Sequence, residues 1–332
     1  MKTFFSIILT VAVVKISFAQ KLNYSINGTV RGFQNNSQLF LSDLSGGTYL
    51  KIDSVKIQNG KFQFKGKLKS NPVQFAVHTK DYTDRVSFWV ENTPMTISLE
   101  KGKFRQAIIK GSKTQSEAET FNKIIEKAEN ETRATEQFIR ENPASVISAL
   151  QLGFIKSEIS KESLVDLFKT LSPKVKESIY GQRISDYLTL NKNPQIGEKY
   201  IDFEEKNSAG KSVKLSDYDG KIVLLDFWGT WCAPCIEAFP ELIEIYKEFN
   251  GKGFEILGVA ADAKMEAVKK VEDRFGITWI NVSDLKGDQN KAVITYGINA
   301  FPANFLIDIN GIIIARNLSG DELKNKLKEL LE

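Results

Sequence analysis

Apolar and polar residues alternate in short runs over residues 20–111. Two of these runs are Tyr24-Ser-Ile-Asn-Gly-Thr-Val and Lys61-Phe-Gln-Phe-Lys, and Asn59-Gly60 stands directly before the second. Alternation is typical of strands with one buried face, and Asn-Gly between two such runs indicates a tight hairpin. This stretch is therefore predicted to form a small antiparallel β domain, either one sheet or a sandwich.

The spacing of apolar residues changes to three and four over residues 112–192, where Glu, Lys, Ala and Ile become frequent and Gly becomes rare. Such a stripe predicts amphipathic helices. We expect four of them, over 116–140, 143–154, 164–171 and 175–190. None carries a pattern typical of catalysis. This helical spacer is expected to pack between domains or to offer a surface for a homodimer.

From residue 193 to residue 332, short apolar runs alternate with amphipathic stretches, which is the pattern of an α/β domain. A run such as Phe254 to Ala260 suits a strand buried on both faces, and a crossover helix before it makes its pairing with the preceding strand parallel. We expect a mixed sheet flanked by helices. The expected elements are a hairpin over 201–215, strands over 221–227, 254–260, 280–282, 303–308 and 312–316, and helices over 233–249, 265–275, 289–296 and 321–331.

Both cysteines of the chain, Cys232 and Cys235, lie where a predicted strand gives way to a predicted helix. A sulfur at the start of a helix faces unpaired amide N–H groups and the positive end of the helix dipole, which favours the thiolate. Cys235 follows one turn later, close enough to resolve a mixed disulfide formed at Cys232. The C-x-x-C spacing in this context predicts a redox function.

Other roles for the two cysteines have less support in the sequence. A structural disulfide across two residues would constrain the unfolded chain little. A structural zinc site needs four ligands, whereas the chain has two cysteines and the single histidine His78. We expect His78 to be an ordinary packed or surface residue, and we expect neither a metal nor an organic cofactor.

Residues 1–19 are typical of a secretory signal peptide. Lys2 provides a positive start, Phe4 to Val14 is almost wholly apolar, and Ser17-Phe-Ala precedes Gln20 as a small-x-small cleavage site. The protein is therefore expected to be exported to the periplasm or cell envelope. The net charge of +4 falls to +2 once Lys2 and Lys15 leave with the leader, and no basic tract is present, so nucleic acid is not an expected partner.

The motif Asp226-Phe-Trp-Gly-Thr-Trp-Cys-Ala-Pro-Cys resembles the thioredoxin fold and, within it, the TlpA/ResA-like family of exported thiol–disulfide oxidoreductases. The resemblance runs from about Pro194 to the end and includes Tyr296-Gly-Ile-Asn-Ala-Phe-Pro and the strand that follows it. The stretch 261–285 resembles the strand–helix insertion of that family. Residues 20–111 resemble a β-rich domain of unknown function that precedes the redox domain in exported members.

This resemblance implies further site residues. Phe301-Pro302 matches the family's cis-proline position, which would face the cysteines and pair with an extended substrate segment, with Trp231 as a wall of the site. Asp226 matches a buried carboxyl that handles the proton of the second cysteine. ResA-like proteins often place a glutamate three residues after that cysteine; here Ala238 stands there, and Glu237 is expected to point toward solvent. Asp226 is therefore our first candidate and Glu237 the second.

The sequence predicts a protein disulfide reductase whose Cys232 thiolate attacks a client disulfide and whose Cys235 then releases the reduced client. By resemblance, the electron donor is a membrane-embedded or exported partner, and roles in cytochrome c maturation or envelope redox homeostasis follow. Two alternatives stay open. One is a thiol peroxidase on the same fold, although Trp231-Cys-Ala-Pro-Cys replaces its usual cysteine element. The other is a non-redox envelope binding module whose β domain carries the function.

Overall fold

The computed structural model describes residues 23–45 and 49–332, so the predicted leader at 1–19 lies outside the described residues. They form two compact units. The first comprises Lys51–Lys113 with the described part of Met1–Ser42, and the second comprises Thr114–Glu332 with the described part of Asp43–Leu50. Within this part of the chain, no helix is long and apolar enough to cross a membrane.

The first unit is a β sandwich of two four-stranded sheets, ordered β4-β1-β7-β8 and β3-β2-β5-β6. Its strands are β1 (Asn23–Arg31), β2 (Gln38–Asp43), β3 (Leu50–Lys56), β4 (Lys61–Lys67), β5 (Val73–His78), β6 (Arg85–Val90), β7 (Pro94–Glu100) and β8 (Ile108–Lys110), with a 3-10 turn η1 (Phe104–Gln106) before β8. The alternating residues of these strands bury one apolar core. β1 pairs antiparallel with β4 and parallel with β7, and the parallel pair is a feature that alternation along single strands cannot reveal.

Two details of this unit match their predictions. Asn59 and Gly60 both have positive φ, 50° and 69°, and Gln58 and Lys61 exchange backbone hydrogen bonds around them, which is the predicted tight hairpin. His78 is buried, and its Nε2 lies 2.9 Å from the hydroxyl of Ser42. It is therefore a packed histidine.

The helices of the second unit begin with α1 (Lys113–Ile125), α2 (Glu131–Glu141), α3 (Val146–Ile155), α4 (Lys161–Thr170), α5 (Pro173–Lys176) and α6 (Ile179–Leu190). The single helices predicted over 116–140 and 175–190 are wrong, because each stretch holds two. Asn130 starts α2 by accepting a hydrogen bond from the amide of Arg133, and Ser178 starts α6 in the same way. Each cap begins a new helix, although the three- and four-residue spacing of apolar residues continues across it.

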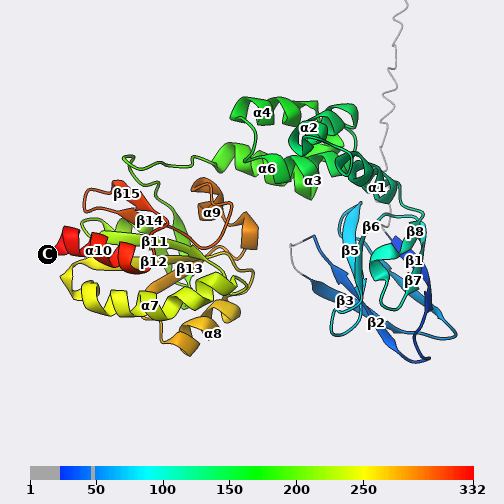
Figure 1. Cartoon of the computed structure of the whole chain (residues 1–332), viewed down its shortest axis with the longest axis horizontal. Coiled ribbons are helices and arrows are strands. Elements are labelled where there is room, and N and C mark those ends of the chain that lie inside the picture. Colours follow the sequence, from blue (N-terminus) through cyan, green and yellow to red (C-terminus); the bar gives the residue numbers. More distant parts are fainter. Residues whose placement is uncertain (1–22, 46–48) are drawn as a thin grey trace, which may run out of the picture. The chain divides into compact units, whose positions relative to one another are not determined.

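The C-terminal domain contains a seven-stranded sheet in the order β10-β9-β13-β12-β11-β14-β15 (Figure 1). Its strands are β9 (Glu204–Asn207), β10 (Ser212–Lys214), β11 (Ile222–Trp228), β12 (Phe254–Ala260), β13 (Ile280–Ser283), β14 (Ala303–Ile307) and β15 (Ile313–Arg316). Its helices are α7 (Ala233–Phe249), α8 (Met265–Phe275), α9 (Lys291–Thr295) and α10 (Gly320–Leu331), with 3-10 turns η2 (Leu215–Tyr218), η3 (Asn250–Lys252) and η4 (Gly287–Gln289). β11 is parallel to β12 and antiparallel to β14, so the predicted mixed sheet flanked by helices is confirmed.

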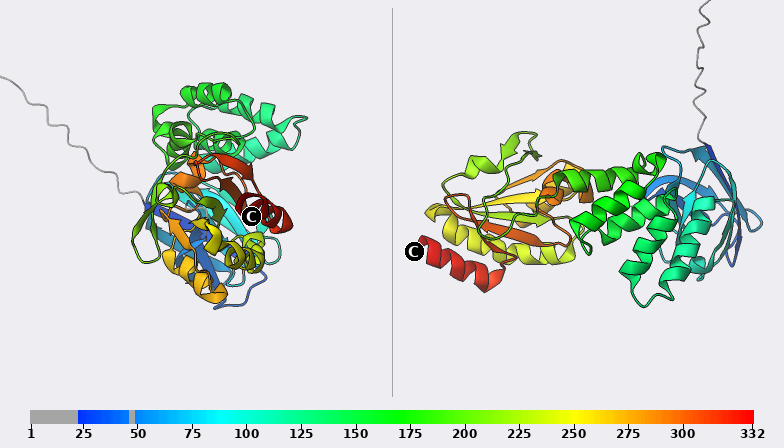
Figure 2. Two further views of the ribbon diagram at one scale, coloured as in Figure 1. Left: turned by 90° about the vertical axis from the view of Figure 1, so that its left-hand side faces the viewer. Right: turned by 90° about the horizontal axis from the view of Figure 1, so that it is seen from above.

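Helices cover both faces of this sheet. α7, α8 and α10 pack on one face and α9 on the other (Figure 1). In the right-hand view of Figure 2, α10 in red lies beside α7 in yellow-green, and the two helices are in contact. The central strand β11 is buried along its whole length. Its alternate residues Leu224 and Trp228 face α7, and Asp226 has the same parity, so its carboxyl faces the helix that carries the cysteines.

Candidate active site

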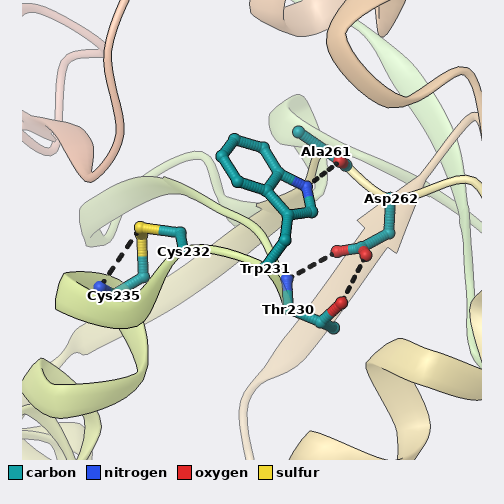
Figure 3. Close-up of a disulfide and its surroundings, with 6 residues drawn as sticks. All are labelled: Thr230, Trp231, Cys232, Cys235, Ala261 and Asp262. Atoms are coloured by element: carbon teal, nitrogen blue, oxygen red, sulfur yellow. Dashed lines mark hydrogen bonds between the residues drawn. A yellow bond between two sulfur atoms is a disulfide. The ribbon is translucent and has the colours of Figure 1, made fainter. Parts of the chain in front are cut away.

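Cys232 is the N-cap residue of α7, and Cys235 lies in the first turn of that helix. The two sulfurs form a disulfide, and the backbone N–H of Cys235 donates to Sγ of Cys232 at 3.2 Å (Figure 3). Both residues are nearly covered, with exposed fractions of 5% and 3%. Pro234 occupies the first turn, where a missing N–H removes no helical hydrogen bond. The strand-to-helix position predicted for the pair is confirmed.

The loop before Cys232 is held by Asp262, a residue that the sequence reasoning missed. The amide of Thr230 donates to one carboxylate oxygen of Asp262 at 2.9 Å, and the Thr230 hydroxyl donates to the other at 2.6 Å (Figure 3). Asp262 is buried. Since β11 and β12 are parallel, their carboxyl ends meet at one edge of the sheet. An aspartate two residues after β12 was therefore a signal available in the sequence.

Trp231 is the most exposed aromatic side chain of the site, with an exposed fraction of 57%. Its indole N–H donates to the carbonyl oxygen of Ala261 at 3.0 Å (Figure 3). Its ring meets that of Phe301 edge-on, with centroids 5.2 Å apart. Trp231 is thus fixed at one end by a hydrogen bond and on one side by an aromatic contact, and it presents a rigid apolar surface to solvent.

The peptide bond between Phe301 and Pro302 is cis, as the resemblance implies. Pro302 and Cys235 line the same small cavity. Phe301 is half-buried and Pro302 is exposed. The structure therefore brings the predicted substrate-binding turn beside the disulfide, although the turn lies almost 70 residues further along the chain.

Asp226 lines this cavity together with Cys235. Burial raises the pKa of the Asp226 carboxyl from 3.8 to about 7, because removing a carboxylate from water disfavours its charged form. A group with such a pKa can accept or release a proton near neutral pH. Glu237 is exposed and does not line the cavity, which agrees with its expected direction toward solvent.

Trp228 forms part of the apolar layer beneath the cysteines. It is fully buried, its indole N–H donates to the side-chain oxygen of Asn281 at 2.9 Å, and its ring packs edge-on against Phe239 of α7. Among the described residues, no group of His, Cys, Asp and Glu could hold a metal ion. The chemistry that these side chains can carry is thiol–disulfide exchange coupled to proton transfer.

Comparison with known proteins supports thiol–disulfide exchange as the chemistry of this site. A family model described as the AhpC/TSA family matches residues 196–316, and one described as a domain of unknown function (DUF4369) matches residues 24–118. The "Thiol-disulfide oxidoreductase ResA" of Bacillus thuringiensis subsp. konkukian is 35% identical over 146 residues, which cover 44% of this chain and 82% of the relative. The protein of that name from Geobacillus thermodenitrificans is 34% identical over 148 residues, which cover 45% of this chain and 83% of the relative.

A solved thioredoxin domain of a thiol-disulfide oxidoreductase from Bacteroides vulgatus shares 34% identity and superposes with a TM-score of 0.40 over 42% of this chain and 99% of that one. The two ResA relatives each match over more than four fifths of their own length. The chain therefore belongs to the ResA/TlpA-like family of thiol–disulfide oxidoreductases.

Proposed function

We propose that this oxidoreductase is an exported protein disulfide reductase that uses the Cys232–Cys235 couple. The observation that supports it most is the position of Cys232 as the cap of α7, where it is bonded to Cys235, which lines one small cavity with Pro302. A sulfur in that position is nucleophilic once reduced, and the turn lies where a client segment can approach it.

In the first step, reduced Cys232 attacks a client disulfide. The thiolate is stabilised by the N-terminus of α7, which is 17 residues long, and by the amide of Cys235, which already points at the sulfur. One client sulfur leaves as a thiolate, and the other becomes linked to Cys232 as a mixed disulfide.

In the second step, Cys235 attacks Cys232 and releases the client. The Cys235 thiol must first lose its proton, and Asp226 is the titratable group deepest in the cavity that both residues line. With a pKa of about 7, Asp226 is partly ionised at neutral pH and can take that proton.

The client would bind as an extended segment along the backbone of Phe301, in the manner of strand addition. Trp231 would contact side chains next to the client disulfide, because its exposed ring stands beside Phe301. We propose clients with accessible disulfides in the envelope, including an apocytochrome c whose haem-site cysteines have been oxidised to a disulfide, and a membrane-embedded or exported electron donor.

The proposed organisation is a cleaved signal peptide over 1–19, a β-rich domain over 20–111, a helical region over 112–192 with a surface for a homodimer, and the redox domain over 193–332. The apolar leader and the use of the chain's two cysteines as a redox pair support export to an oxidising compartment. Ala233-Pro234 between the cysteines supports reduction as the direction.

Trapping tests this proposal. With Cys235 changed to Ser, the mixed disulfide cannot be resolved, so Cys235→Ser incubated with a disulfide-containing protein such as insulin accumulates a covalent adduct that dithiothreitol releases. Cys232→Ser retains one thiol as well and is the matched control. Cys232 and not Cys235 caps α7, so Cys235 lacks the position that favours the thiolate and should form far less adduct. Equal trapping by the two variants, or none by either, would show that Cys232 is not the attacking sulfur.

A further inference from the structure

The cavity behind the disulfide runs from the buried strand β11 to the surface between α7 and α10. Its volume is about 70 Å³, enough for about two water molecules at roughly 30 Å³ each. Asp226 and Cys235 lie at its buried end, whereas Ala238, Glu241 and Ser319 at the other end are exposed. It therefore connects the buried carboxyl with solvent.

Asp226 needs such a connection. Among the side chains that line the cavity, the titratable ones are Asp226, Cys235 and Glu241. Once Asp226 has taken the Cys235 proton, it faces apolar neighbours such as Leu224 and Phe239. Neither can accept a proton, so the proton leaves through the cavity and passes Glu241, which is the third titratable group.

Glu241 occupies the mouth of the cavity. It is exposed, and a Cβ built on Gly320 would lie 2.8 Å from one of its carboxylate oxygens, so the carboxylate rests against the first residue of α10. Glu241 follows Ala238 by one helical turn on the same face of α7. Ala238 fills little of the cavity at the position where the resemblance places a glutamate.

We propose that Glu241 is the solvent-side group of a proton path and exchanges protons between solvent and Asp226 through water held in this cavity. The inference rests on the proposed function, because it concerns the proton of the resolving step. Glu241 acts through water and Asp226 and does not touch the sulfurs, so it is a positioning residue for the proton. The alanine at 238 leaves the space for the water.

The Cys235 S–H bond breaks and its proton goes to the Asp226 carboxylate. The Cys235 sulfur forms a bond to Cys232, the bond between Cys232 and the client sulfur breaks, and the client leaves as a thiolate. The two enzyme sulfurs are oxidised and the client disulfide is reduced. Asp226 then passes its proton through cavity water to Glu241 and solvent, where client thiolates are protonated.

The test uses the full mature chain with a chromogenic aromatic thiol linked to Cys232, and it follows release of that thiol by stopped flow. Glu241→Gln keeps the size of the side chain but cannot carry a proton. We expect resolution to slow by about tenfold, less than the roughly 10²–10⁴-fold that a directly acting acid–base group contributes, because Asp226 still takes the Cys235 proton. Glu244→Gln, an exposed change one turn further along α7 outside the cavity, is the matched control and resolves at the wild-type rate.

Two further measurements separate proton transfer from a structural role at the start of α10. Imidazole buffer, a diffusible proton carrier, should restore the rate of Glu241→Gln in proportion to its concentration and leave the wild type unchanged. Adding Ala238→Glu to Glu241→Gln should also restore the rate, since it returns a carboxylate to the cavity. The proposal would be overturned if Glu241→Gln resolved the mixed disulfide at the wild-type rate with no dependence on imidazole. It would also be overturned if the variant were slow and neither imidazole nor Ala238→Glu restored its rate.

The outcomes also separate this inference from the proposed function. If Cys235→Ser traps clients and Glu241→Gln resolves normally, the path fails and the reductase stands. If Cys235→Ser traps nothing, the reductase itself fails. If Glu237→Gln resolves slowly and Glu241→Gln resolves at the wild-type rate, the proton leaves through Glu237, on the helix face that points away from the cavity.

Discussion

Replacing Asp226 with Asn removes a buried acid without changing its shape, and the effects on stability and on catalysis should be opposite in sign. The carboxyl is buried on the α7 side of β11 and lines the cavity beside Cys235. Asn keeps the side-chain volume, so no large hole is created. What changes is the ability to ionise and to accept the proton of Cys235.

The stability effect follows from the pKa. Burial raises the pKa of Asp226 from 3.8 to about 7, and at about 1.4 kcal/mol per unit this destabilises the folded protein by about 4 kcal/mol once the group is charged. Below pH 3.8 both the folded and the unfolded chain hold the proton, so the full stability is present. As the pH rises toward about 7 only the unfolded chain releases it, and stability falls before levelling off. Asp226→Asn should lose this fall and be the more stable protein at high pH.

Asp226→Asn should slow catalysis. Asn cannot accept the Cys235 proton, so we expect resolution of the mixed disulfide to slow by about 100-fold or more, as removal of a positioned base does. The wild-type rate should rise with pH through about 7, where Asp226 becomes ionised, and the variant should lack that rise. Stopped-flow release of a chromogenic thiol from Cys232 measures the rate, and urea unfolding at a series of pH values measures the stability.

Glu205 provides the control. Among the described residues, it is the second buried carboxyl whose pKa burial raises to about 7, and it accepts a hydrogen bond from Asn290. Its cross-strand partner Val213 belongs to the core on the α9 side of the sheet, away from the cysteines. Glu205→Gln should change the pH dependence of stability but leave the resolution rate alone. If Asp226→Asn resolves as fast as the wild type, or unfolds with the same pH dependence, the assignment of the proton to Asp226 is refuted.

Two further predictions concern the loop around Cys232. Asp262→Ala should destabilise the protein by about 1–3 kcal/mol because the amide and hydroxyl of the half-buried Thr230 lose their shared acceptor. Urea unfolding measures this loss, and an unchanged midpoint would show that these two hydrogen bonds do not stabilise the protein. Trp231→Ala should raise KM for a protein substrate such as insulin several-fold and leave turnover of a small aromatic disulfide unchanged, since a small disulfide brings no neighbouring side chains to pack on the exposed ring. An equal loss with both substrates would assign Trp231 to the chemistry itself.

The C-terminal domain was predictable from sequence because its central strands β11 and β12 are strongly apolar and its turns carry clear signals. Phe254–Ala260 and Met265–Phe275 have the bounds that their patterns predict. Asn310-Gly311 indicates the β14–β15 hairpin, and Gly311 has a positive φ of 80°. The position of Cys232 at the start of α7 follows from the same change of period.

The breaks in the helical region were not predictable from spacing. The apolar stripe runs across Asn130 and Ser178, and whether such a residue caps a new helix depends on contacts that the stripe does not encode. Asp262 and Glu241 were missed for a related reason. Each acts on residues brought to it by the sheet or by neighbouring helices, so its role depends on tertiary contacts rather than on a motif.

The reduction potential of the Cys232–Cys235 couple tests the central claim most directly. The purified mature protein would be equilibrated with dithiothreitol buffers of defined ratio, and its thiols trapped and counted. A protein disulfide reductase should have a potential near or below about −250 mV, in the range of thioredoxin. A value near about −120 mV, typical of strong oxidants, would contradict the account and reverse the direction of electron flow.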